Sequence, residues 1–220
     1  MCEDYREQRA IAAAVSEVDE AKCLSRGDAP SAPYGQLKLV AGVDISFRSS
    51  ADSSFGEDCT DAVAVLVVCE FPSMQVVRTL SRTVSLQQPY IPGFLAFREG
   101  EPLLLLAQEA LSLPEHEQPQ LLFGPCILTD PPARALTLFL SVDGNGLLHE
   151  RRCGLATYIG VKSGLPTVGV AKDYHPFSST PPEAHLASQR AMREHCRTAL
   201  QKRGDSLTLF DPPLGAVRAL

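Results

Sequence analysis

The chain has 220 residues, of which 45% are hydrophobic, and its formal net charge is −6. This length suits one domain, or one domain with appendages, and is enough to bury a hydrophobic core. The acidic balance excludes a protein that holds nucleic acid by bulk positive charge, so binding to nucleic acid would need a local groove.

The sequence also argues against a membrane-spanning or secreted protein and against a fold held by disulfides or structural zinc. No apolar stretch is long enough to cross a membrane, and the amino terminus is acidic and polar where a secretory signal would be basic and then apolar. We therefore expect a soluble intracellular protein. The seven cysteines are scattered and form no Cys-x-x-Cys pair, which argues against a disulfide framework and a structural zinc site.

The first half of the chain predicts a helix followed by three strands. Helix formers with interspersed charges predict a helix over residues 5–24, and residues 27–35 form a connecting loop. Residues 36–47, 61–71 and 75–86 are strand-like and have no helix between them, which predicts an antiparallel meander. We expect an N-terminal helix and linker over residues 1–35 and a catalytic-type domain over residues 36–220.

Asp44 lies in the apolar middle of the first predicted strand. A charged side chain there is costly unless it is paired or binds a metal. An aspartate that caps neighbouring backbone amides explains Asp44 equally well. The residue alone does not decide between the two.

A proline-rich loop, residues 88–93, precedes a predicted helix over residues 94–113. It presents Tyr90 and Ile91 on stiff backbone, which suits plain packing or a wedge inserted between stacked bases. Pro102 predicts a kink or a restart in the helix. Gly100 and Pro102 interrupt the periodicity, so the sequence does not decide whether Glu99 or Glu101 points inward.

Two apolar runs compete for the next strand position, one starting at Gln120 and the other at Leu136. The second run ends at Asp143-Gly-Asn-Gly, which predicts a buried strand that delivers a carboxylate to the edge of the sheet. Ligands and metals collect at such strand ends in open α/β sheets. An Asp-Gly turn without chemistry is the alternative.

The rest of the chain predicts a helix over residues 154–164, a strand over 165–171 that ends at Lys172, a helix over 183–203 and a last strand from 214. Thr180 and Glu183 match a capping box for the third of these elements. Lys172 could neutralise a phosphate oxygen or be an ordinary strand-end lysine. His149 could bind phosphate or base, or be structural. The element order predicts an α/β fold, a mixed sheet flanked by helices.

Asp44, Glu99 and Asp143 all lie near the ends or breaks of predicted elements. If these carboxylates converge, a cation must offset their repulsion, and ligand sets made only of oxygen favour magnesium or manganese over zinc. Such an ion can activate water and stabilise the charge that develops on a phosphodiester. The acids therefore suggest metal-dependent phosphodiester hydrolysis.

Four segments together resemble the endonuclease V family: Gly-Val-Asp44-Ile-Ser-Phe, Pro-Tyr-Ile-Pro-Gly-Phe-Leu-Ala-Phe-Arg-Glu99, Val-Asp143-Gly-Asn-Gly-Leu-Leu-His149 and Gly-Val-Ala-Lys172. The resemblance covers residues 36–218, and the residues in these motifs resemble those of vertebrate members. It implies a ribonuclease H-like fold and magnesium-dependent cleavage of the second phosphodiester bond 3′ to an inosine, leaving 3′-hydroxyl and 5′-phosphate ends. Animal members prefer inosine in single-stranded RNA, and deoxyinosine DNA is a further substrate class.

The resemblance also implies a role for each matching residue. Asp44 and Asp143 would hold Mg²⁺, with Mn²⁺ able to substitute, while Glu99 completes the catalytic set and Lys172 assists at the phosphate. The strand-separating wedge would be Pro89, Tyr90, Ile91 and Pro92, and the inosine pocket would be formed by Gly93, Gly144, Gly146, His149, Gly154 and Leu155. A glycine-lined pocket suits a base that is read closely by main-chain groups. We expect a monomer that binds inosine-containing RNA or DNA, located in the cytoplasm with a nuclear or nucleolar pool.

The sequence departs from the family pattern in two places. Residues 123–137 look like an insertion into the strand that leads to Asp143. The family also continues past the last predicted strand to a fourth site residue, and this chain stops before it. We therefore expect a variant with impaired catalysis or stability. The alternatives are a non-catalytic binder of inosine-containing nucleic acid and an unrelated metal-dependent phosphohydrolase.

Overall fold

A five-stranded mixed sheet organises the computed structural model, with strand order β3-β2-β1-β4-β5. The structure describes residues 2–15, 37–47, 61–124, 145–170, 187–202, 205–209 and 215–218. Asp143, Gly144 and Lys172 lie outside these ranges. The sheet strands are β1 (Leu39–Phe47), β2 (Asp61–Glu70), β3 (Val76–Ser85), β4 (Leu121–Phe123) and β5 (Thr167–Val168).

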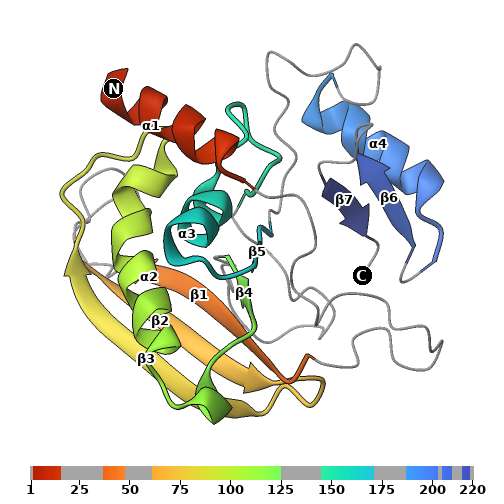
Figure 1. Cartoon of the computed structure of the whole chain (residues 1–220). Coiled ribbons are helices and arrows are strands. Elements are labelled where there is room, and N and C mark those ends of the chain that lie inside the picture. Colours follow the sequence, from red (N-terminus) through yellow and green to blue (C-terminus); the bar gives the residue numbers. More distant parts are fainter. Residues whose placement is uncertain are drawn as a thin grey trace, which may run out of the picture.

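The helices and the remaining strands are α1 (Cys2–Ala13), α2 (Leu95–Leu111), the short 3-10 helix η1 (Glu115–Glu117), α3 (Leu155–Ser163), α4 (Gln189–Ala199), β6 (Ser206–Leu209) and β7 (Gly215–Arg218). Figure 1 shows α1, α2 and α3 beside this sheet, and α4, β6 and β7 grouped apart from it. The last two strands pair with each other as an antiparallel hairpin. None of the helices in the described ranges has the length and apolar character of a bilayer-crossing segment.

The pairing of the strands confirms the predicted meander and the mixed sheet. β1 pairs antiparallel with β2, and β2 pairs antiparallel with β3. On its other side β1 pairs parallel with β4, which pairs parallel with β5. β1 is therefore the strand at which the sheet changes from antiparallel to parallel pairing, and Asp44 lies on it opposite Val65.

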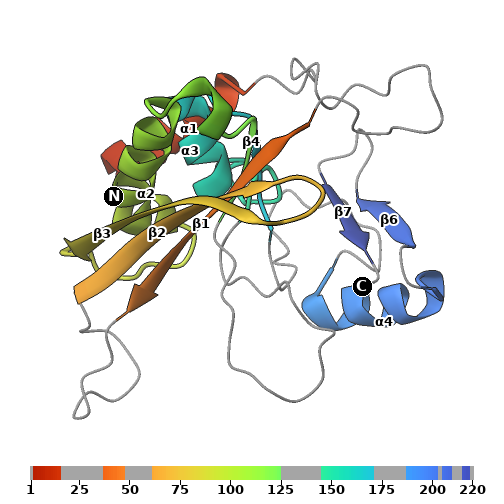
Figure 2. The same cartoon turned by 90° about the horizontal axis from the view of Figure 1, so that it is seen from below.

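The helices α1, α2 and α3 cover one face of the sheet (Figure 2). Side chains alternate between the two faces of a strand, and Ala41, Val43 and Ile45 of β1 point into the core under these helices. Leu103 and Leu106 of α2 are fully buried against the same core. A smaller apolar cluster, formed by Leu37, Val40 and Leu121, lies at the start of β1.

The position between β1 and β5 is filled by Leu121–Phe123, the first of the two competing apolar runs. The second run, from Leu136, lies outside the described residues. The chain on the two sides of residues 125–144 meets at Ala156 of α3. A Cβ built on Gly124 would lie 3.1 Å from the Ala156 side chain, and the Asn145 carbonyl accepts a hydrogen bond from the Ala156 N–H at 3.3 Å.

Several predicted element bounds are wrong. The first helix begins at Cys2 and ends at Ala13, because the chain turns at residues 14 and 15. The strand predicted over 165–171 is regular only at residues 167 and 168. The helix predicted from 183 begins at Gln189, where the Ser188 side chain caps it by accepting from the Ala191 N–H at 3.1 Å. β6 was not among the strands expected from the sequence.

Candidate functional site

The loop before α2 presents the residues that were predicted as a wedge. Tyr90 and Ile91 are 46% and 39% exposed, so both side chains are accessible at the tip of the loop. Gly93 ends the loop in a turn with φ +78°, and a Cβ there would lie only 2.9 Å from Nη2 of Arg151. Glycine is therefore required at position 93 both for the backbone conformation and for the space.

His149 connects this loop to the segment that follows residue 145. Its Nε2 lies 3.1 Å from the carbonyl oxygen of Gly93, and its Nδ1 lies 3.2 Å from the backbone N–H of Arg151. Since an N–H must donate, Nδ1 accepts and Nε2 carries the proton that it donates to Gly93. Two main-chain groups thus fix the orientation of the imidazole ring.

Arg151 makes a second connection to the same loop. Its Nη2 donates to the Gly93 carbonyl at 2.5 Å, and its Nε donates to the side-chain oxygen of Gln8 in α1. The guanidinium also stacks over the Phe94 ring at 4.2 Å. The Arg151 side chain is only 9% exposed, so these interactions are shielded from water.

Gln8 completes this polar cluster. Its side-chain nitrogen donates to the carbonyl of Gly93 at 3.1 Å and to the carbonyl of Cys153 at 3.2 Å. Gln8 is 1% exposed. The Gly93 carbonyl therefore receives donors from Gln8, His149 and Arg151, and α1 is fastened to both the wedge loop and the 146–154 segment.

The loop at residues 145 and 146 is fixed on the first turn of α3. Gly154 donates to the Gly146 carbonyl at 3.1 Å, and Ala156 donates to the Asn145 carbonyl. These bonds satisfy N–H groups that have no partner within the helix. A Cβ on Gly154 would lie 1.9 Å from the Asn145 oxygen, so no side chain fits there. Leu155 is 1% exposed, and its side chain packs in the core.

Asp44 lies on the side of β1 opposite Val43 and Ile45. Burial raises the pKa of its carboxyl from 3.8 to about 6, and the Ile45 N–H, which donates to Oδ1 at 2.9 Å, lowers it in part. Gly42 lies two residues away, with nothing within 4 Å of a Cβ built on it. The carboxylate is thus partly buried and has open space beside it. A cation bound in that space would stabilise its charged form.

Glu99 is buried on α2, 8% exposed, on the helix side that also carries Leu95 and Leu103. The element that carries it, α2, contacts β1, which carries Asp44. Within the described ranges, no three His, Cys, Asp or Glu side chains come together as ligands for a metal. The third predicted acid, Asp143, and the predicted lysine, Lys172, lie outside those ranges.

Hydrogen bonds therefore join the loop at residues 89–93 to His149, and Gly154 to Gly146. Of the predicted pocket residues in the described ranges, only Leu155 has its side chain in the core. Sequence reasoning missed Gln8 and Arg151, which join the parts. The local signal for Gln8 was its position three residues before Ile11, which places both side chains on the same side of the helix, and Ile11 lies in the core. Arg151 carried no signal beyond its position two residues after His149.

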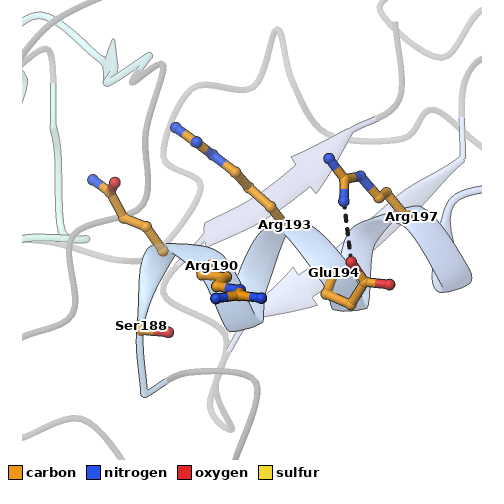
Figure 3. A pocket seen from close by; sticks show the side chains of 6 residues that line it. Ser188, Arg190, Arg193, Glu194 and Arg197 are labelled. Atoms are coloured by element: carbon orange, nitrogen blue, oxygen red, sulfur yellow. Dashed lines mark hydrogen bonds and ion pairs between the residues drawn. The ribbon is translucent and has the colours of Figure 1, made fainter.

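The described part of the chain also has two surface hollows. One, of about 190 Å³, lies at the wedge loop and is lined by Pro89, Ile91, Phe94 and neighbouring residues. The other, of about 610 Å³, lies along α4 and is lined mainly by arginines (Figure 3).

The family model described as Endonuclease V matches residues 5–125 and 129–210. The chain belongs to the endonuclease V family. Human Endonuclease V is 38% identical over 177 residues, which is 80% of this chain and 51% of the human protein. The mouse protein is 39% identical over 139 residues, 63% of this chain and 34% of its own length. The chain thus spans about half of the human relative and about a third of the mouse one.

Solved structures of endonuclease V confirm the fold. The crystal structure of human ENDOV matches with a TM-score of 0.69 and 35% identity, covering 96% of this chain and 73% of that one. Endonuclease V from Ciona intestinalis, in complex with a 24mer DNA that contains an inosine followed by a ribo-adenosine, matches with a TM-score of 0.64 and 26% identity, covering 95% and 71%. The predicted ribonuclease H-like, mixed α/β sheet flanked by helices is therefore correct.

Proposed function

We propose that this endonuclease V family member is a divalent-metal-dependent endonuclease acting on inosine in single-stranded RNA, and on deoxyinosine in DNA. The cut falls at the second phosphodiester bond 3′ to inosine and leaves 3′-hydroxyl and 5′-phosphate ends. The protein acts as a monomer in the cytoplasm, with a nuclear or nucleolar pool. The observation that carries the proposal is the shared Gly93 carbonyl, which ties the wedge loop to His149 and Arg151.

The wedge and pocket act on the strand before any bond is cut. Tyr90 and Ile91 expose apolar surface that can enter a base step and replace stacking lost by the flipped nucleotide. The glycines at positions 93, 146 and 154 bring main chain close to the base, since Cβ atoms at two of them would collide with neighbouring groups. His149 offers its imidazole at the rim of this pocket.

The acids act on the phosphodiester. Asp44 and Asp143 hold Mg²⁺ or Mn²⁺ in this proposal, and oxygen donors of this type fit such a hard cation. The bound metal supplies Lewis-acid stabilisation of the charge on the scissile phosphate. Asp44 contributes a carboxylate whose raised pKa of about 6 falls when a cation is bound. Glu99 is the third carboxylate of the set, and Lys172 neutralises a phosphate oxygen.

A second candidate function is a binder that recognises inosine and does not cut. One observation supports it: the segments predicted to form the wedge and the pocket are bonded to one another through the Gly93 carbonyl. The two functions share the wedge and pocket and differ only in the acids.

One assay separates the two functions. The purified chain is incubated with Mg²⁺, and separately with Mn²⁺, on a single-stranded RNA that contains one inosine. A product ending one nucleotide beyond inosine, lost in Asp44→Ala and Asp143→Ala, supports the endonuclease. Inosine-dependent binding without product supports the binder. If neither cleavage nor inosine-dependent binding occurs, both proposals are wrong. The deoxyinosine DNA strand is run in parallel to rank the two substrates.

A further inference from the structure

One side of helix α4 carries a row of exposed arginines, Arg190, Arg193 and Arg197, which we call the arginine face. Residues three and four positions apart lie on the same side of an α-helix, so the three side chains project together. Figure 3 shows these side chains extending from α4, with Glu194 paired to Arg197 at 3.1 Å. They line the 610 Å³ hollow together with Ser188, Gln189 and Glu194.

The other side of α4 fixes the orientation of this face. Met192 is 3% exposed, and Cys196 is partly buried. The helix is thus anchored by its apolar side and by the Ser188 cap, while the arginines point to solvent. A helix with this division is a stable platform for a charged surface.

The charge of this helix opposes that of the whole molecule. α4 carries three arginines and one glutamate, a net charge of +2, in a chain whose net charge is −6. Arg197 shares its charge with Glu194, and the ion pair is exposed and weak in water. A local positive surface on an acidic protein attracts a polyanion without making the whole protein bind indiscriminately.

The spacing of the arginines suits a linear polyanion. Arg197 is seven positions after Arg190, so the face extends about 10 Å along the helix axis. One strand presents successive phosphates over such a length. Arginine binds phosphate oxygens through two parallel N–H donors, which surface lysines cannot do. A nucleic-acid strand carries one charge at every nucleotide, whereas the charges of an acidic protein segment of mixed sequence are unevenly spaced.

We propose that the arginine face of α4 binds the sugar–phosphate backbone of the substrate strand, independently of sequence and away from the inosine. The proposal rests on the proposed function only in taking nucleic acid as the ligand. The wedge and pocket select the base, and the arginine face supplies a large part of the affinity for any strand.

The test uses the full chain and a fluorescein-labelled, single-stranded RNA that contains no inosine. Fluorescence anisotropy gives the Kd from 50 to 200 mM KCl for wild type, Arg190→Glu/Arg193→Glu, and the matched control Arg6→Glu/Lys38→Glu. The control makes the same change in net charge at exposed residues of α1 and of the segment before β1. Arg190→Lys/Arg193→Lys keeps the charge and removes the two-pronged geometry. Circular dichroism confirms that each variant is folded.

We expect the Kd of the α4 reversal to rise about tenfold relative to the control at 100 mM KCl. The slope of log K against log[KCl] should fall by about 1.4, which corresponds to two phosphate contacts on a single strand. The lysine pair should keep the slope and lose about threefold in affinity. An inosine-containing strand should lose the same factor as the inosine-free strand.

Equal losses in the α4 reversal and the control would overturn the proposal, as would a wild-type chain that binds no RNA. Wild-type binding of a poly-glutamate peptide as tight as that of RNA, lost equally in the α4 reversal, would assign the face to an acidic protein and also overturn it. Because the readout uses an inosine-free strand, it is independent of the proposed cleavage. A chain that neither cuts nor prefers inosine, yet shows the expected salt slope, would contradict the proposed function alone.

Discussion

The guanidinium of Arg151 lies 4.2 Å from the centre of the Phe94 ring and donates from Nη2 to the Gly93 carbonyl. This cation–π contact and this hydrogen bond hold the start of α2, and with it the loop at residues 89–93, against the segment that carries His149. Arg151 also bonds the side-chain oxygen of Gln8 and pairs with the Glu150 carboxylate at 3.2 Å, so its charge is compensated by an anion as well as by a π face and a carbonyl. Arg151, together with Gln8 and His149, thus holds the loop at residues 89–93 against the segment at residues 146–154.

Arg151→Ala should lower the free energy of unfolding by about 2–3 kcal/mol, because it leaves Gln8 with an unsatisfied buried oxygen and removes the stacking on Phe94. Urea unfolding followed by circular dichroism measures the change. Arg152→Ala is the control, since Arg152 is the exposed neighbour. A loss in Arg151→Ala no larger than in Arg152→Ala would show that the polar cluster does not hold the two segments together.

Gln8→Leu should cost about 2 kcal/mol, because it removes both donors to the Gly93 and Cys153 carbonyls and the acceptor for Arg151. The loss should be accompanied by weaker inosine preference, since α1 fastens the wedge loop to the pocket segment. Unfolding in urea and binding of inosine RNA measure the two effects. Gln108→Leu changes an exposed glutamine of α2 and is the control. An unchanged inosine preference in a destabilised Gln8→Leu protein would limit Gln8 to a purely structural role.

Gly154→Ala should be severely destabilising, by about 3 kcal/mol or more, because the new methyl group overlaps the Asn145 carbonyl, which is backbone and cannot rotate away. Gly42→Ala is the matched control, since nothing lies within 4 Å of its Cβ. Thermal unfolding of the two variants gives the comparison. The packing of the 145–146 loop on α3 would be refuted by equal midpoints for the two alanine variants.

Asp44→Asn should stabilise the metal-free protein at neutral pH. Because the folded-state pKa is about 6 and the ordinary value is 3.8, the folded state keeps the proton that the unfolded chain loses between these values. Ionisation of Asp44 therefore lowers stability as pH rises from about 4 to 6, by on the order of 1–2 kcal/mol after its partial exposure is taken into account. Thermal midpoints measured in EDTA at pH 4 and pH 7.5 test this. The variant should gain only at pH 7.5, and a gain of equal size at pH 4 would exclude the ionisation of Asp44 as its cause.

The sequence predicted the sheet meander and the irregular loop at residues 88–93 because their causes are local. The valine-rich alternation of residues 61–70 and 76–85 specifies strands without reference to the rest of the fold. Gly164, with φ +78°, ended α3 as expected. Prolines 89 and 92 exclude regular structure whatever surrounds them.

The rest depended on contacts between distant parts of the chain. Two apolar runs matched β4 equally well, and only pairing with Val40–Gly42 of β1 selects Leu121–Phe123. Gln8 bonds residues that are 85 and 145 positions away, and no local pattern encodes such partners. The capping box at residues 180–183 predicted a helix start there, but the observed helix begins at Gln189 and is capped by Ser188.

The most direct measurement of the central claim is the ratio of dissociation constants for three single-stranded RNAs that are identical except at one position. That position holds inosine, guanosine or adenosine, and EDTA prevents cleavage. The connected wedge and pocket predict binding to the inosine strand at least about tenfold tighter than to the other two, a difference of about 1.4 kcal/mol. Equal dissociation constants for the three strands would contradict the account.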